Sequence, residues 1–81
     1  MRASFVRTLR AGWADDVTAS LYRVGSSHVV VVARRMARGP EAMVLRADAD
    51  GRVADWRDLS TTCGTTDARM ALEDAGYEVA P

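Results

Sequence analysis

The chain has 81 residues, which is enough for one small domain with a single hydrophobic core. Apolar residues make up 48% and charged residues 27%, proportions that are typical of folded globular proteins and argue against disorder. The lone Cys63 and the lone His28 exclude an internal disulfide and a four-ligand zinc site of Cys and His. We therefore expect a folded chain with no cofactor and no structural metal.

No apolar run is long enough to cross a membrane, and a free cysteine is typical of a reducing compartment, so we expect a cytoplasmic protein without a membrane segment. The sequence contains no Lys, Ile, Asn or Gln, the residue types with AT-rich codons. This bias indicates a GC-rich bacterial host. Because Lys is absent, the permanently charged cations are all Arg, whose guanidinium can donate two hydrogen bonds to one carboxylate or phosphate.

The net charge is zero, but the charges are segregated along the chain. Residues 1–46 carry eight Arg and three acids, whereas residues 47–81 carry three Arg and eight acids. Such an asymmetry indicates either a basic binding face, or two halves that neutralise each other within the sheet or between subunits.

Apolar alternation predicts a series of antiparallel strands over residues 17–60. The sequence VTASLYRV (17–24) alternates, as expected for a half-buried strand. HVVVVARR (28–35) is β-branched without alternation and is therefore predicted to be a central strand covered on both faces. MVLRA (43–47) and RVADWRDL (52–59) complete the series.

A change of apolar spacing after Cys63 predicts a helix over residues 65–76. Thr65 or Thr66 is a candidate N-cap, and Gly76 fits the position that ends a helix. Residues 1–13 fit either a short helix or an edge strand, and we favour the strand.

The predicted fold is therefore one α+β domain (1–81) with two layers, an antiparallel sheet of four or five strands and one C-terminal helix. A single helix leaves one sheet face open. Residues 1–13 or a second subunit would have to cover that face, which makes a homodimer a reasonable expectation.

The stretch DADGRVADW (48–56) suggests two incompatible structures. Aligned to an EF-hand calcium loop, it places Arg46 and Arg57 at positions 1 and 12, where the ion needs oxygen ligands. A β-hairpin requires only an Asp that bonds its own backbone and an Asp-Gly pair that turns the chain. We interpret the stretch as a hairpin turn.

Catalysis has weak support in the sequence. Cys63 precedes the predicted helix and is a candidate nucleophile, but His28 is the sole candidate base and lies far away in sequence. We expect no enzyme, and leave open whether Cys63 is reactive or simply a small apolar residue.

Two sets of residues are candidates for binding. Arg34, Arg35 and Arg38, with Arg23 and Arg46 on neighbouring strands, could gather into a basic patch that contacts nucleic-acid phosphates. Alternatively, these arginines pair with the acids of the fourth predicted strand. Trp13, Tyr22 and Trp56 are candidates for a protein interface, or else belong to the core.

Two motifs together resemble a known group of proteins. DADGRVADWRDL followed by DARMALEDAGYEV is similar to small uncharacterised actinobacteriophage and actinobacterial proteins, in which a D-x-D-G-x-V-x-D-W-x-x-L hairpin precedes a D-H-x-x-A-L-x-x-x-G-Y-x-V helix. The resemblance covers about residues 41–79, and Ala68 replaces the group's His. It implies a phage accessory protein that acts by binding, and it carries over no functional residue.

Three functions follow as hypotheses. The first is a small phage-type accessory protein that binds a host protein through the open sheet face. The second is a nonspecific nucleic-acid-binding protein that uses the Arg patch. The third is a self-associating structural protein whose basic and acidic segments pair between subunits.

Overall fold

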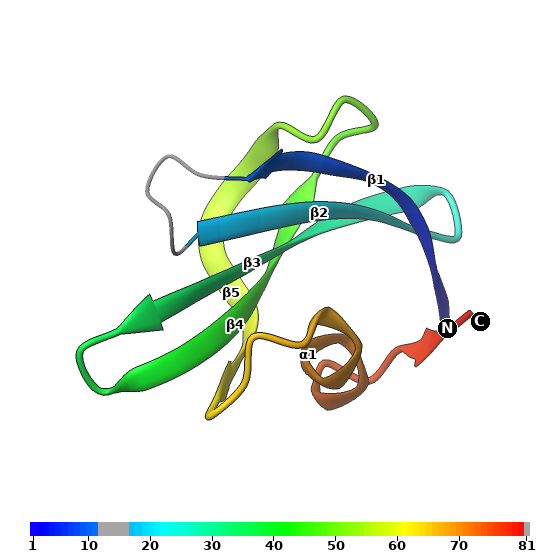
Figure 1. The fold of residues 1–81 in the computed structure, drawn as a ribbon. Coiled ribbons are helices and arrows are strands. Elements are labelled where there is room, and N and C mark those ends of the chain that lie inside the picture. Colours follow the sequence, from blue (N-terminus) through cyan, green and yellow to red (C-terminus); the bar gives the residue numbers. More distant parts are fainter. Residues whose placement is uncertain (12–16, 81) are drawn as a thin grey trace.

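The computed structural model describes residues 1–11 and 17–80, and the side chains of all of these except residues 10, 11 and 54–59. The elements are, in chain order, β1 (Arg2–Ala11), β2 (Val17–Val24), β3 (Ser27–Met36), β4 (Gly39–Ala47), β5 (Val53–Cys63), α1 (Ala68–Asp74) and β6 (Glu78–Val79). The strands form one sheet in the order β5-β4-β3-β2-β1-β6 (Figure 1).

Neighbouring strands from β1 to β5 are antiparallel, whereas β6 returns after α1 and pairs with β1 in parallel. β2 spans the residues that its alternation predicts, and β3 is central, as its unbroken Val run indicates. The N-terminal segment, which fits a helix or the favoured strand by sequence, is a strand over Arg2–Ala11. It is not an edge strand along its whole length, because Arg2 and Ala3 also pair with β6.

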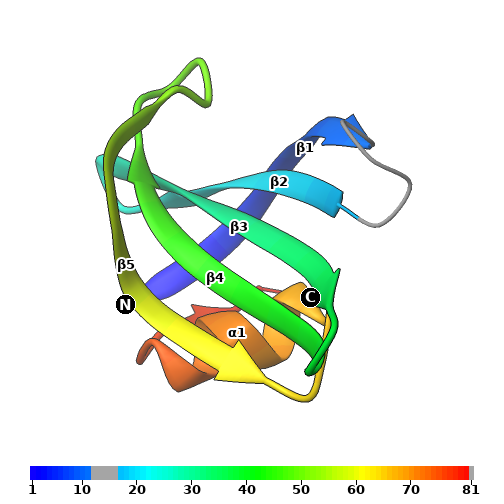
Figure 2. The ribbon, with the colours of Figure 1, turned by 90° about the vertical axis from the view of Figure 1, so that its left-hand side faces the viewer.

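The predicted fold class is wrong. The described chain forms a curled half-barrel of six strands with one short helix, and not a two-layer domain with four or five strands (Figure 2). The difference has a physical origin in β3, whose Val side chains point alternately to both faces, so both faces need cover. A helix of seven residues can cover only part of one face.

One face of the sheet packs against α1, and we call it the helix face. Val29 and Val31 of β3 and Val44 of β4 lie on this face and are at most 3% exposed. Ala71 and Leu72 of α1 are fully buried against them. Burial of a Val or Leu side chain of this kind contributes about 1.5–3 kcal/mol, so this layer is the larger part of the core.

The curl of the sheet encloses part of the opposite face. Leu21, Val30 and Leu45 are aligned across β2, β3 and β4 on that face and are at most 1% exposed. At this end of the sheet the β4–β5 turn reaches β1, where Arg7 donates from Nη2 to the backbone carbonyl oxygen of Asp50 at 3.0 Å.

The Leu9 side chain packs directly under Gly51 in the same turn, so closely that a Cβ atom on Gly51 would lie 2.5 Å from Leu9 Cδ2. Gly51 also has φ +88°, a conformation that other residues rarely adopt. The absence of a side chain at Gly51 therefore permits the contact that brings the β4–β5 turn onto β1.

The helix is shorter than the predicted 65–76. Asp67, rather than Thr65 or Thr66, is the N-cap, and its side chain accepts a hydrogen bond from the Arg69 N–H at 2.9 Å. Gly76 ends the helix, as predicted, with φ +94° and an N–H that donates to the Glu73 carbonyl at 3.0 Å. The threonines extend the connection from β5 instead, and Thr65 accepts from the Asp67 N–H.

Gly51→Ala is expected to destabilise the fold more than Gly64→Ala. Both glycines have nearly the same positive φ, +88° and +87°, so both variants incur a similar backbone cost of about 1 kcal/mol. At Gly64 a new Cβ meets nothing within 4 Å, whereas at Gly51 it displaces Leu9 and adds about 1–3 kcal/mol of overpacking.

Urea unfolding of the two variants measures the difference. Adding Leu9→Ala to Gly51→Ala should recover part of the loss, because it removes the atoms that clash. Equal free energies of unfolding for the Gly51 and Gly64 variants would contradict the proposed role of the Leu9 contact.

Candidate functional site

The acidic turn between β4 and β5 is a hairpin turn. Asp48 Oδ1 accepts hydrogen bonds from the N–H groups of Asp50 and Arg52, each at 2.9 Å, and the Gly51 N–H donates to the Asp48 carbonyl at 3.0 Å. The Asp48 carboxylate therefore accepts hydrogen bonds from the backbone of its own turn, as the hairpin interpretation requires. No group of three or more His, Cys, Asp or Glu in the described part of the chain is arranged to hold a metal ion.

Cys63 and His28 lie at opposite ends of the sheet. Cys63 is paired with Glu41 at one end of β4, and His28 with Ala47 at the other. Glu41 and Ala47 are six residue steps apart on an extended strand, a span of about 20 Å, so the Cys63 and His28 side chains cannot form a nucleophile–base pair. Cys63 is an exposed free thiol, and not a buried one.

The three aromatic candidates have different outcomes. Tyr22 belongs to the core at 9% exposure, and the exposed Phe5 ring packs edge-on against it with centroids 5.6 Å apart. Burial, and then the negative charge of Asp67, raise the pKa of the Tyr22 hydroxyl. Trp13 lies outside the described residues. Trp56 is on β5, but its side chain also lies outside the described part.

The structure does not assemble the predicted arginine patch. Arg23 pairs with His28 and Arg46 with Val29, so both lie at the end of β3 remote from Arg34, Arg35 and Arg38. Arg34 forms an ion pair with Glu41 of β4, and this acid is not among those of the fourth predicted strand. Arg35 and Arg38 remain as exposed cations at the end of the β3–β4 hairpin.

Sequence reasoning missed an apolar surface on the face opposite α1. Cross-strand pairing aligns Ala19, Val32 and Met43, and places Val17 beside Arg34 in the next row. Strand alternation puts Met36 on the same face, at the end of β3. We define the open patch by these apolar residues, which are half-buried except for the more exposed Met36: Val17, Ala19, Val32, Met36 and Met43.

The open patch is the continuation of the buried layer formed by Leu21, Val30 and Leu45. The two groups lie on one face of the same three strands, but the curl of the sheet closes only over the latter group. The open sheet face expected from the sequence is thus reduced to its outer part, near the β3–β4 hairpin.

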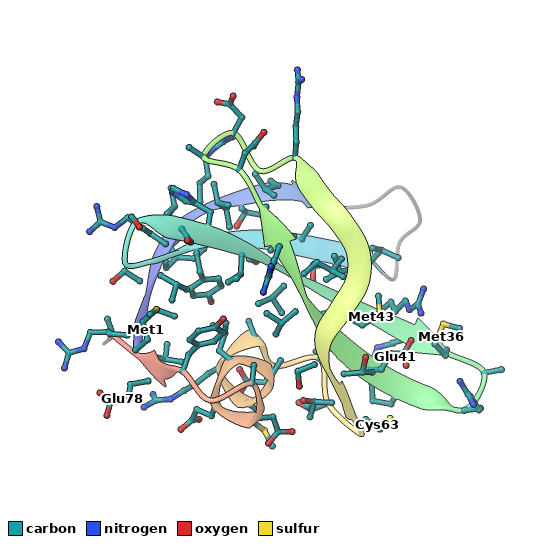
Figure 3. The ribbon with its side chains drawn as sticks, turned by 180° about the vertical axis from the view of Figure 1, so that it is seen from behind. Met1, Met36, Glu41, Met43, Cys63 and Glu78 are labelled. Atoms are coloured by element: carbon teal, nitrogen blue, oxygen red, sulfur yellow. The ribbon has the colours of Figure 1, made fainter. Side chains whose placement is uncertain are left out.

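An ion pair between Arg34 and Glu41 borders the open patch. Figure 3 shows Glu41 at the same end of the sheet as Met36 and Met43. Arg34 Nε donates to Glu41 Oε1 at 2.6 Å, and Arg34 Nη2 points to Met43 Sδ at 3.8 Å. The Glu41 side chain is 11% exposed and that of Arg34 is 37% exposed. The carboxylate is therefore held largely out of water, while part of the guanidinium remains at the surface beside the methionine.

The open patch thus combines apolar side chains with a fixed cation at its border. Half-buried apolar side chains supply contact area, and methionines adapt to different shapes of partner. The sequence alone shows that Val32, Arg34 and Met36 share one face of a strand. Only the β3–β4 register shows that Met43 lies beside them and that together they form a surface.

Compared with known proteins, the chain matches no family model, no curated protein and no solved structure. The resemblance to phage proteins therefore stays a hypothesis. The described part of the chain has no helix with the length and hydropathy to cross a membrane.

The Asp48 turn predicts acid sensitivity. Hydrogen bonds from the backbone N–H groups of Arg52 and Asp50 hold the pKa of the Asp48 carboxyl below its usual range. Because the folded pKa is lowered, the stabilisation is present above the ordinary Asp pKa of about 3.9 and is lost as the pH falls through the folded value.

Asp48→Asn should therefore be less stable than the wild type at pH 7, and the difference should shrink as the pH is lowered below about 4. Urea unfolding at several pH values measures it. Asp50→Asn is the control for loss of one negative charge in the same turn. If the stability difference between Asp50→Asn and the wild type shrank in the same way at low pH, net charge and not the Asp48 hydrogen bonds would be responsible.

Removing Arg34 from its pair with Glu41 should lower the free energy of unfolding more than breaking an exposed ion pair does. Arg34→Ala leaves a largely buried carboxylate without its cation, and we expect a loss of about 1–3 kcal/mol in the free energy of unfolding. Arg69→Ala is the matched control, because Arg69 and Glu73 are both more than half exposed and 3.7 Å apart. That variant should lose less than about 0.5 kcal/mol in the same assay. Similar losses in both variants would show that the Glu41 environment gives no special stability.

Proposed function

We propose that this chain is a small accessory protein, of the phage type implied by its hairpin and helix motifs, that acts by binding a host protein through the open patch. The observation that carries the proposal is the row of half-buried apolar side chains left where the curl of the sheet ends. Single exposed apolar residues are common on protein surfaces, but a contiguous group on neighbouring strands is typical of an interaction site.

The Arg34–Glu41 pair supports a specific rather than a general apolar contact. Its Arg34 guanidinium is held in place by Glu41 and lies against Met43 at the border of the patch. A fixed Arg beside apolar side chains is a common combination at the centre of protein interfaces, because it adds directional hydrogen bonds to apolar contact.

The proposal is tested with paired Ser variants. We expect Val32→Ser/Met43→Ser to reduce the recovery of a bound host protein from an actinobacterial lysate about tenfold, since the loss of about 1.4 kcal/mol of apolar contact changes an affinity by that factor. The measurement is quantitative mass spectrometry of proteins retained by the immobilised chain.

Met70→Ser is the matched control, because Met70 is 51% exposed on α1, away from the patch. It should leave the recovery unchanged. Urea unfolding of each variant separates lost binding from lost fold. Equal recovery by the wild type and the Val32/Met43 variant would contradict the proposed site, and an equal loss in the Met70 variant would point to a different surface.

A further inference from the structure

We infer that the tip of the β3–β4 hairpin, residues 35–38, selects a partner segment that is acidic as well as apolar. The inference rests on the proposed function, because it assigns the partner's chemistry at one border of the open patch. All four tip residues, Arg35, Met36, Ala37 and Arg38, are exposed. In Figure 1 the hairpin extends past α1, so that its turn is an outlying point of the molecule.

The tip is held in a defined shape by short-range pairing. Arg34 pairs with Glu41, Arg35 with Pro40 and Met36 with Gly39, which leaves only Ala37 and Arg38 in the turn. The Gly64 N–H donates to the Pro40 carbonyl at 2.8 Å and so ties the hairpin to the end of β5. A partner therefore meets side chains on a fixed backbone and not on a long flexible loop.

The tip has an excess of positive charge. Glu41 neutralises Arg34, whereas neither Arg35 nor Arg38 forms an ion pair with any carboxylate in the described part of the chain. Two cations of the hairpin are thus available to an outside partner. Arg side chains at the border of an interface attract and orient acidic partners.

The same tip carries an apolar residue that continues the open patch. Met36 is 40% exposed and shares its strand face with Val32 and Arg34. A partner lying along β3 would meet apolar side chains first and then, at the end of the strand, Arg38 in the turn, while Arg35 projects from the other face of the same tip. The complementary segment is therefore a short stretch of protein with an apolar centre flanked by Asp or Glu.

Nucleic acid fits this surface less well. Two arginines neutralise about two phosphates, which gives little affinity at physiological salt, and the whole chain has no net charge to add. Unless its bases are unstacked, duplex DNA also offers Val32, Met36 and Met43 little apolar surface beyond the thymine methyl groups. A protein segment supplies both kinds of contact at once.

The test uses synthetic fluorescein-labelled peptides of about ten residues, which span about 33 Å when extended. Each has the centre Leu-Val-Leu, flanked on both sides by Glu in one peptide, Lys in a second and Ser in a third. Fluorescence anisotropy at low salt measures binding to the folded full chain. We expect the Glu peptide to bind about tenfold more tightly than the Lys peptide.

Two double variants locate the charge preference. Arg35→Glu/Arg38→Glu should reverse it, so that the Lys peptide binds better than the Glu peptide. Arg23→Glu/Arg46→Glu makes the same change in net charge at the far end of the sheet, on residues that are also exposed, and should keep the preference for Glu. A reversal in both variants would mean that net charge, and not the tip, decides, and would overturn the inference.

The outcomes also separate this inference from the proposed function. If all three peptides bind equally to the wild type but more weakly to Val32→Ser/Met43→Ser, the open patch stands and the acidic selection is overturned. If no peptide binds, the inference is overturned, while recovery of a host protein that depends on Val32 and Met43 would still support the patch.

Two further results would assign the tip to other partners and would also overturn the inference. One is tighter binding of a labelled random DNA duplex than of the Glu peptide, lost in Arg35→Glu/Arg38→Glu. The other is a dimer seen by light scattering in the wild type and absent in that variant, which would make a second copy the occupant.

Discussion

The need to bury both faces of β3 shapes the rest of this small protein. Val29 and Val31 point to one face and Val30 to the other, and all three are at most 3% exposed. A chain of this length has few residues left for cover after five main strands, and its helix has only seven. Bending the sheet covers the second face without a further helix or strand, because the end of one hairpin then lies over residues of another.

The bend depends on a contact between residues distant in sequence. Arg7 and Leu9 of β1 meet Asp50 and Gly51 in the β4–β5 turn, through one hydrogen bond and one close apolar contact. The remainder of the opposite face lies beyond the reach of this closure, and the open patch is that remainder. The same curvature therefore accounts for the buried Leu21 and for the half-buried Val32 and Met43.

The elements with strong local patterns could be predicted from the sequence, and the fold class could not. VTASLYRV and the Val run of β3 indicate strands on their own, and Gly76 marks the end of the helix. The curl requires knowing that Leu9 meets Gly51, which no periodicity within either segment indicates. β6 has two residues, too few for any pattern, and its partner strand is some seventy-six positions away in sequence.

The candidate site was only partly visible in the sequence, for a related reason. Arg34, Arg35 and Arg38 look like one cluster along the chain, but neighbouring strand residues point to opposite faces. The hairpin register also places Arg34 opposite Glu41, with which it forms an ion pair. Met36 and Met43 become part of one surface only through that register. From the sequence Tyr22 fits either an interface or the core, and only the assembled sheet places it in the core cluster that includes Ala71 and Leu72. Trp13 and Trp56 stay predictions.

The pairing of β1 with β6 has a consequence for how the chain is made. Backbone bonds join the Glu78 N–H to the Met1 carbonyl and the Ala80 N–H to the Ala3 carbonyl, each at 2.9 Å. During synthesis β1 leaves the ribosome before β6, so the outer edge at Arg2 and Ala3 is covered only after the helix and the segment beyond it have emerged. Until then β1 is a bare strand edge, able to pair with neighbouring chains. Because β6 follows β1 in the chain, the Arg2–Ala3 edge stays open until β6 has been made, so a later segment completes an earlier strand.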